Sequence, residues 1–171
     1  MSLPRYTFEL AQAPHDVRAY FRLRREIFCE EQGLFAEDDI DATDDVAYSI
    51  IAVEHHVLAG RQVVGIVRIY ETEERLWYGG RLGVKPNYRR VGSIGKGLIQ
   101  KAVTTANAWG CDRFLATVQL QNVRFFRRLH WASLQELEIC DRPHHLMEAD
   151  LAFYPPSQEP RPAQVGLLQA C

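Results

Sequence analysis

A short basic segment rich in glycine, residues 89–97, carries residue types that could bind an anionic ligand. Apolar residues recur after it at three- and four-residue steps, which predicts a helix. The first turn of a helix has backbone N–H groups without partners and the positive end of the helix dipole, so it can hold a phosphate. Gly95 and Gly97 fall in the first turns, where each glycine costs about 1 kcal/mol relative to alanine. We expect the phosphate to approach the bare backbone there.

The charge around this segment favours the same chemistry. No Asp or Glu occurs between Arg75 and Cys111. Seven positive side chains lie in that stretch: Arg75, Arg81, Lys85, Arg89, Arg90, Lys96 and Lys101. On a chain of formal net charge -2, they form a local anion-binding region. A mononucleotide P-loop is excluded, because the spacing Gly-x-x-x-x-Gly-Lys-Ser/Thr is absent.

Charge of the opposite sign precedes this region. Between Glu26 and Gly60 the chain has ten acids and no Lys or Arg. One interpretation is a solvated loop that charge keeps soluble. The other is that part of the segment flanks an acceptor site and attracts a cationic amine.

With the strand-like residues 80–84 before it, the basic segment resembles the coenzyme A pyrophosphate loop of the GNAT (Gcn5-related) N-acetyltransferases. The family pattern is Arg/Gln-x-x-Gly-x-Gly/Ala; here the loop is one residue longer, so Ser93 or Ile94 falls at a glycine position. The resemblance implies acetyl-CoA, or a related acyl-CoA, as the cofactor. It also implies that the strand backbone at Leu82, Gly83 and Val84 holds the pantetheine arm and the acyl carbonyl. The implied diphosphate-binding residues are Arg89, Arg90, Val91, Gly92, Ser93, Ile94, Gly95 and Lys96.

Residues 118–131 resemble the strand, short helix and Phe-Tyr-x-x-x-Gly-Phe phrase of the same family. Phe126 takes the place of the tyrosine that commonly protonates the departing thiolate, and His130 takes the place of the glycine. A phenyl ring has no proton to give. Either another group or water protonates the thiolate, or the protein is a weak or inactive enzyme. The other candidate donors are Tyr70, Tyr78, Tyr88 and Cys140. Asn122 could bond the coenzyme amides or cap the helix N-terminus.

Two residues are candidates for the general base. His144 lies in residues 142–148, which resemble a Pro-His-x-x-Met phrase at the last hairpin of a GNAT subgroup, and imidazole exchanges protons near neutral pH. Glu71 ends a predicted strand, where GNAT enzymes often hold a base or its water. The alternatives are a structural histidine and a solvated turn acid.

The remaining chain supplies the elements that position these groups. Alternating or β-branched residues predict strands over 5–11, 46–55, 62–71, 76–84, 113–119, 133–140 and 146–153. Helices are predicted from Pro14 to the stop at Gly33, from the glycine-rich segment to Trp109, and over 122–129. This order is that of a GNAT fold: an α/β (α+β) domain with a mixed, mostly antiparallel sheet flanked by helices. We expect one domain over residues 1–154 and a loose proline-containing tail over 155–171.

Composition narrows the class further. With 171 residues, 47% hydrophobic, the chain fits one globular domain. No basic-then-apolar leader and no apolar run of about 20 residues is present, so we expect a cytoplasmic protein without membrane contact. Four scattered cysteines argue against a metal site, and a pI near 6.3 argues against nucleic-acid binding. The oligomeric state stays open, with a homodimer as one expectation.

The function that we predict is N-acetyl (acyl) transfer from acetyl-CoA to a primary amine of a small molecule or peptide. Transfer would be direct, through a ternary complex. One alternative is a weak or inactive acyl-CoA-binding module, because of Phe126. Another is an acyl-homoserine-lactone-like synthase, against which the length and the recognisable loop count.

Overall fold

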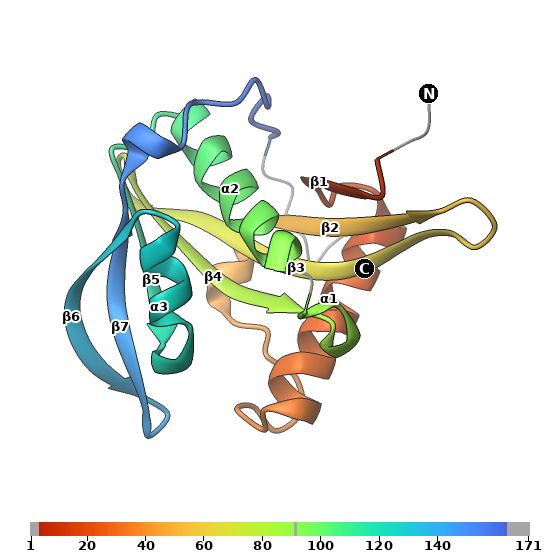
Figure 1. The fold of residues 1–171 in the computed structure, drawn as a ribbon, viewed down its shortest axis with the longest axis horizontal. Coiled ribbons are helices and arrows are strands. Elements are labelled where there is room, and N and C mark those ends of the chain that lie inside the picture. Colours follow the sequence, from red (N-terminus) through yellow and green to blue (C-terminus); the bar gives the residue numbers. More distant parts are fainter. Residues whose placement is uncertain (1–3, 91, 164–171) are drawn as a thin grey trace.

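Residues 4–90 and 92–163 are described by the computed structural model, and they form one seven-stranded sheet with helices on both faces (Figure 1). The strands are β1 (Tyr6–Leu10), β2 (Tyr48–His56), β3 (Gly60–Glu73), β4 (Leu76–Val84), β5 (Arg113–Gln119), β6 (Trp131–Ile139) and β7 (Arg142–Ala149). Their order is β1-β2-β3-β4-β5-β7-β6; β4 and β5 pair in parallel and the other neighbours are antiparallel. The predicted mixed, mostly antiparallel sheet is confirmed.

The helices divide between the two faces of the sheet. They are α1 (Pro14–Arg25), α2 (Gly92–Ala108) and α3 (Leu120–Arg128), with 3-10 turns at Ala42–Asp45, Pro86–Tyr88 and Leu151–Phe153. Strand β2 alternates between two cores, since Ile50 and Ala52 pack on the α2 side and Ile51 and Val53 pack on the α1 side. Both faces of β2 are therefore covered, which explains its nearly continuous apolar sequence.

A bulge in β4 opens the sheet. Ile66 pairs with Gly83 but Arg68 pairs with Gly80, so β4 carries one extra residue there, and Arg81 has a φ of +53°. The parallel pairing of β4 with β5 runs only from Leu76 to Gly79. Beyond that point the two strands diverge, and the gap between them is the feature that positions the site.

The first helix ends differently from the prediction. The α-helix stops at Arg25 and a π-helical segment, Glu26–Glu31, follows, in which the N–H of Gln32 donates to the carbonyl of Ile27 at 3.0 Å. Gly33, with a φ of +62°, then ends the helical run as predicted. Such wide turns rotate the side chains that follow them. Here the segment carries Gln32 and Phe28 to the opening of the sheet.

Close packing explains Gly97. A Cβ atom at this position of α2 would overlap the ring of Phe8 on β1, whereas at Gly95 it would stand 3.7 Å from Phe125. The phosphate explanation is therefore wrong for Gly97, because helix–strand contact already requires a residue without a side chain. Gly95 and Gly92 leave room for a ligand.

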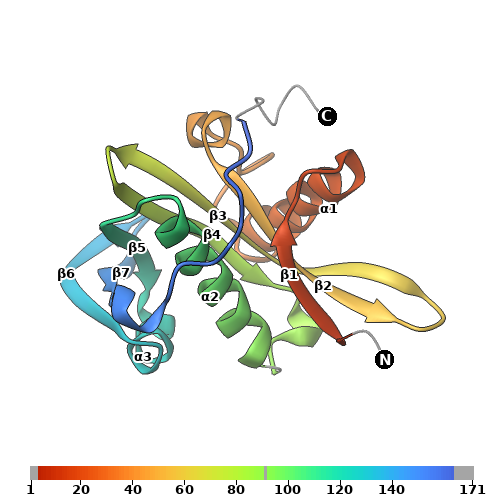
Figure 2. The ribbon, with the colours of Figure 1, turned by 90° about the horizontal axis from the view of Figure 1, so that it is seen from above.

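The described part of the tail is not loose. Residues 155–163 have no helix or strand, but they run across the α2 side of the sheet (Figure 2). The Trp109 indole donates to the carbonyl of Glu159 at 2.8 Å, Lys101 pairs with the Glu159 carboxylate at 2.8 Å, and Arg161 reaches Tyr48 and Glu71. These contacts correct the expectation of a loose tail, and its end, 164–171, lies outside the described residues.

Candidate active site

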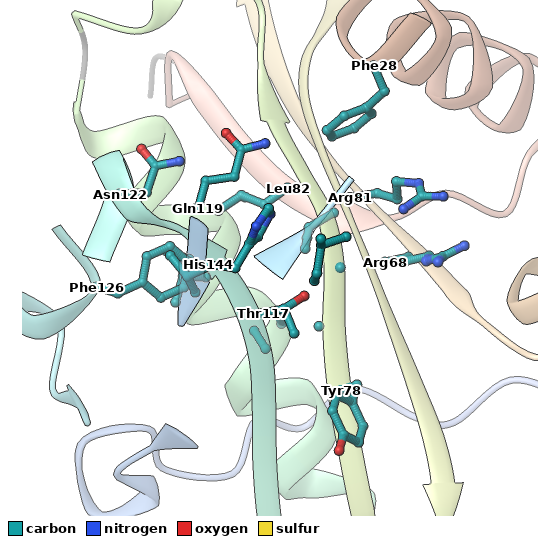
Figure 3. A pocket seen from close by; sticks show the side chains of 18 of the residues that line it. Phe28, Arg68, Tyr78, Arg81, Leu82, Thr117, Gln119, Asn122, Phe126 and His144 are labelled. Atoms are coloured by element: carbon teal, nitrogen blue, oxygen red, sulfur yellow. The ribbon is translucent and has the colours of Figure 1, made fainter. Parts of the chain in front are cut away.

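A cavity of about 330 Å³ occupies the gap where β4 and β5 diverge. Arg68 and Arg81 border it from β3 and β4 on one side; on the other, Gln119 lies on β5 and His144 on β7 (Figure 3). No Asp or Glu of the described residues lines this cavity. The cavity lining therefore has no carboxylate that would pair with an acceptor amine.

A groove of about 560 Å³ leads from the cavity to the N-terminus of α2. It brings together many of the residues predicted to hold the coenzyme: Leu82, Gly83, Val84, Arg89, Gly92, Gly95 and Asn122. Leu82 and Asn122 also line the cavity, so the two hollows adjoin. Asn122 lies within α3 and the cap position is Gln119, so the capping alternative for Asn122 is wrong.

The other predicted loop residues divide into two kinds. Arg90, Ser93 and Lys96 are exposed at the start of α2, whereas Ile94 is fully buried and only its backbone could face a ligand. Val91 lies outside the described residues.

The arginines of the loop are not equally free. Arg89 binds the two oxygens of Glu31 at 2.6 and 2.7 Å, and its Nε donates to the carbonyl of Val84 at 2.9 Å. The Arg89 hydrogen bonds hold the pKa of Glu31 below its usual range. Among the described residues no carboxylate pairs with Arg90 or Lys96. Arg90 and Lys96 thus remain available for a phosphate.

His144 has one ring nitrogen bonded and one free. Its Nδ1 lies 2.9 Å from the carbonyl oxygen of Arg142, which can only accept, so Nδ1 carries the hydrogen. Nε2 is then left with a lone pair at a side chain that is 8% exposed and lines the cavity. His144 stands opposite Gln119 in the β5–β7 ladder, which places both on one face of the sheet. The arrangement suits a general base.

Glu71 lies away from the cavity. It stands opposite Trp77, whose side chain belongs to the core on the α2 side. Its carboxylate accepts the N–H of Arg75 at 2.8 Å and pairs with Arg161 at 3.0 Å, and these contacts lower its pKa. The prediction of Glu71 as the base conflicts with this position, because the sheet separates it from His144.

Phe126 is a wall of the site and not a proton donor. Its ring packs edge-on against Trp131 with the centroids 5.0 Å apart, and it borders both the cavity and the groove. Tyr70 and Tyr78 line the cavity and stack at 5.9 Å, and burial raises the pKa of Tyr70, so that its hydroxyl keeps its proton. Cys140 also lines the cavity.

Tyr88 is a poor candidate for the proton donor, because its hydroxyl already has a hydrogen-bond partner. Its hydroxyl donates to the buried carboxylate of Glu54 at 2.6 Å. This hydrogen bond ties the loop before α2 to β2, and neither hollow is lined by Tyr88.

The two interpretations of the acidic segment each hold for part of it. Phe28, Leu34 and Phe35 of this segment border the cavity, and six of its acids are exposed: Glu30, Glu31, Glu37, Asp38, Asp41 and Asp45. Asp39 and Asp44, by contrast, are 2% and 1% exposed, so they are not solvated. Arg24 reaches Asp39 at 2.7 Å and Asp44 at 2.6 Å. Burial alone would raise the pKa of Asp44, but the hydrogen bonds and charge of Arg24, the backbone N–H of Asp41 and the charge of Arg68 together outweigh it and lower that pKa.

Two strand arginines complete the network. Arg68 pairs with Asp41 at 2.7 Å, and Arg81 pairs with Asp39 at 2.9 Å. Asp39 is therefore neutralised inside the protein, whereas Asp41, with a side chain that is 41% exposed, is paired at the surface. Pairing reduces the attraction that either carboxylate exerts on a cationic substrate.

Several cavity residues were missed from the sequence. Gln119 donates from its amide to Gln32 at 3.2 Å, across the opening between the sheet and the first helix. Thr117 precedes Gln119 on the same face of β5. Polar residues at the end of an otherwise apolar strand were the available indication, but only the divergence of β4 and β5 gives them a role.

No cluster of three or more metal-ligating side chains occurs in the part of the chain that the structure describes. Within that same part, no helix is both long and apolar enough to cross a membrane.

Comparisons with known proteins agree with the geometry. The model of the family described as "Acetyltransferase (GNAT) family" matches residues 14–131. The "Uncharacterized N-acetyltransferase YjcF" of Bacillus subtilis (strain 168) is 28% identical over 144 residues, which are 82% of this chain and 97% of that protein.

Solved structures share the fold. A putative N-acetyltransferase from Lactobacillus plantarum superposes with a TM-score of 0.72 at 20% identity, covering 85% of this chain and 98% of the other. The CoA-dependent acyl-homoserine lactone synthase BjaI gives 0.69 at 18% identity, covering 97% and 98%. At these identities the likeness concerns the fold alone.

The fold and the groove define the class as acyl-CoA-dependent N-acyltransferases. Within that class, the chain belongs to the GNAT acetyltransferase family, because the family model covers well over half of it.

Proposed function

We propose that this protein transfers an acyl group from acyl-CoA, with acetyl-CoA as the simplest donor, directly to the primary amine of a small molecule or peptide. Transfer takes place in a ternary complex in the cytoplasm, by a monomer or a homodimer. The observation that carries the proposal is that the groove at α2 adjoins the cavity that holds His144, with Leu82 and Asn122 lining both. Donor and acceptor then meet at the end of β4.

The groove supplies the donor site. The free N–H groups of the first turn of α2, together with Arg90 and Lys96, bind the diphosphate. The edge of β4 that no longer pairs with β5 offers backbone groups to the pantetheine arm, and an N–H near Leu82 or Val84 stabilises the oxyanion.

The cavity supplies the acid and the base. As the amine nitrogen attacks the thioester carbonyl, His144 Nε2 takes a proton from the amine. The C–S bond then breaks, and the hydroxyl of Tyr70 or Tyr78 protonates the departing thiolate. Because the thioester is already activated, position accounts for much of the rate and no covalent acyl-enzyme is needed.

A second candidate function is a weak or inactive acyl-CoA-binding module. Phe126 favours it, because that wall of the site has no hydroxyl beside the sulfur position.

Calorimetry with coenzyme A and a thiol-release assay across an amine panel test both. We expect coenzyme binding, turnover with at least one amine, and a loss of about a hundredfold in kcat for His144→Gln with unchanged coenzyme affinity. Binding without thiol release for any amine would support the module. No binding would reject both. An arm with S-adenosylmethionine as the acceptor tests the homoserine-lactone-type reaction.

A further inference from the structure

We infer that the apolar half of the cavity between β4 and β5 is an acyl-chain site, which makes the protein selective for acyl groups longer than acetyl. The inference rests on the proposed function and names its donor class. It follows from how the two faces of the sheet line the cavity.

The cavity has a half of mixed polarity and an apolar half, separated by the alternation of side chains along the strands. Thr117 and Gln119 of β5 face the α1 side, where Arg68 and Tyr70 of β3 add polar groups. Phe28, Leu34 and Phe35 add apolar groups to that same side. The intervening residues of β5 face the α2 side. That half is lined by Val67, Ile99, Ala102, Val103, Phe114, Ala116, Val118, Phe126 and Trp131.

The apolar half lies within the main core of the protein. All nine of its lining residues are at most 7% exposed, and they belong to the cluster that α2 and α3 form with the sheet. Protein cores are normally packed to the density of organic crystals, and a hollow among apolar side chains forfeits their dispersion contacts. A hollow of this kind is stabilised when an apolar ligand fills it.

Small residues keep this half open. Ala102 of α2 and Ala116 of β5 line it, and Gly79 of β4 stands opposite Ala116 in the parallel ladder. The space beside Gly79 is filled by the Phe114 ring, which a Cβ atom there would approach to 3.0 Å, so Gly79 serves close packing. Larger residues at the two alanines would fill the space that the acyl chain requires.

The apolar half begins at the reaction centre. Leu82 and Phe126 border both the groove and the cavity, so an acyl carbonyl held at the end of β4 has its chain directed past the Phe126 ring. A phenyl ring lines an acyl passage without the buried hydroxyl that a tyrosine would place there. The departure from the family phrase at Phe126 therefore has a physical use.

The amine acceptor occupies the opposite half. His144, Tyr70 and Tyr78 supply its polar contacts on the α1 side of the gap between β4 and β5, and the acyl chain does not compete with it because the chain extends to the α2 side. The two substrates thus approach the end of β4 from the two faces of the sheet.

The test measures dissociation constants of coenzyme A, acetyl-CoA, butyryl-CoA and hexanoyl-CoA by calorimetry, which needs no knowledge of the acceptor. We expect affinity to rise with chain length by up to about fourfold per methylene, the value of burying one CH₂ group. Ala116→Leu should abolish this gain. Ala132→Leu, the same change at an exposed position of β6, should keep it.

The outcomes separate the inference from the proposed function. Equal affinity for acetyl-CoA and hexanoyl-CoA overturns the acyl-chain site but leaves the transferase intact, whereas a lack of affinity for coenzyme A itself overturns the proposed function. If the melting curve shows that Ala116→Leu does not fold, Ala102→Val is used instead, since it reduces the space of the apolar half from the α2 side. A chain-length gain that persists in both variants places the acyl group elsewhere and rejects the inference.

Discussion

The acidic and the basic segments of this chain are both runs of like charge in the sequence, but the structure places their charged side chains differently. In the acidic segment, Asp39 and Asp44 are buried against Arg24, which comes from the first helix. In the basic segment, Arg90 and Lys96 stay exposed without a carboxylate partner among the described residues. A run of like charge therefore does not by itself indicate an external ligand.

The difference lies in what each segment packs against. The acidic segment folds over the arginines of α1, β3 and β4, and burial makes close pairing obligatory because an unpaired buried charge is very costly. The basic segment surrounds the N-terminus of a helix, which is the positive end of the helix dipole. The helix itself therefore cannot neutralise these cations. The buried acids are thus paired within the fold, whereas Arg90 and Lys96 keep charges that no carboxylate of the described residues neutralises.

Removing a charge from the buried network should have the largest effect. Asp44→Asn leaves Arg24 without one of its two carboxylate partners, and we expect a loss of about 3–5 kcal/mol in the free energy of unfolding. Urea titration measures it. The neighbouring exposed Asp45→Asn should change stability by less than about 0.5 kcal/mol. Equal effects would mean that the network is not a stabilising core.

Acid should reproduce part of this loss in the wild-type protein. The pKa values of Asp44 and Glu54 are lower in the folded than in the unfolded chain, because Arg24 bonds the first and Tyr88 and Arg5 bond the second. Their stabilisation is complete well above pH 4 and is lost as the pH falls from about 4 through the folded pKa. Urea titrations at several pH values should show this slope, and a shallower one in Asp44→Asn. An identical slope would contradict the assignment.

Reversing a charge in the basic segment should affect binding and not stability. Arg90→Glu places a carboxylate beside the diphosphate site, and we expect coenzyme A affinity to fall about tenfold or more. Calorimetry measures it, with the melting temperature unchanged. Arg22→Glu, the same change at an exposed arginine of α1 outside residues 89–97, is the control. Unchanged affinity in Arg90→Glu would refute the loop assignment.

The glycines of α2 give a smaller and more local contrast. Gly97→Ala should cost about 1–3 kcal/mol of stability, because its Cβ would overlap Phe8, and should leave coenzyme affinity unaltered. Gly92→Ala has open space and should be nearly neutral for stability. Urea titration of both variants tests this. A neutral Gly97→Ala would return that glycine to the phosphate explanation.

Ionic strength should have the smallest effect, a few-fold change that distinguishes the two segments directly. The KM for acyl-CoA should rise with salt because exposed cations attract it, whereas the KM for the amine should stay nearly constant because the nearby acids are already paired. Initial rates at several salt concentrations provide both values. An amine KM that rises in parallel would restore the acidic segment as a steering surface.

The sequence by itself determined most of the elements and the glycine-rich loop before α2. The β-branched residues of β2, the helical spacing after Gly92 and the glycine-rich turn are local patterns, and local backbone preferences are enough to set them. The groove residues from Leu82 to Gly95 could be named for the same reason, since they are nearly contiguous in the chain.

Only the tertiary structure determined which charged residues pair and which face of the sheet each side chain occupies. Glu71 and Tyr70 are neighbours in sequence, yet the strand directs them to opposite faces of the sheet, and only Tyr70 lines the cavity. The bulge at Arg81, which opens that cavity, depends on how β3 pairs with β4. The residues that neutralise Asp39 and Asp44 come from distant elements. Such contacts join positions far apart in the chain, so no local pattern encodes them.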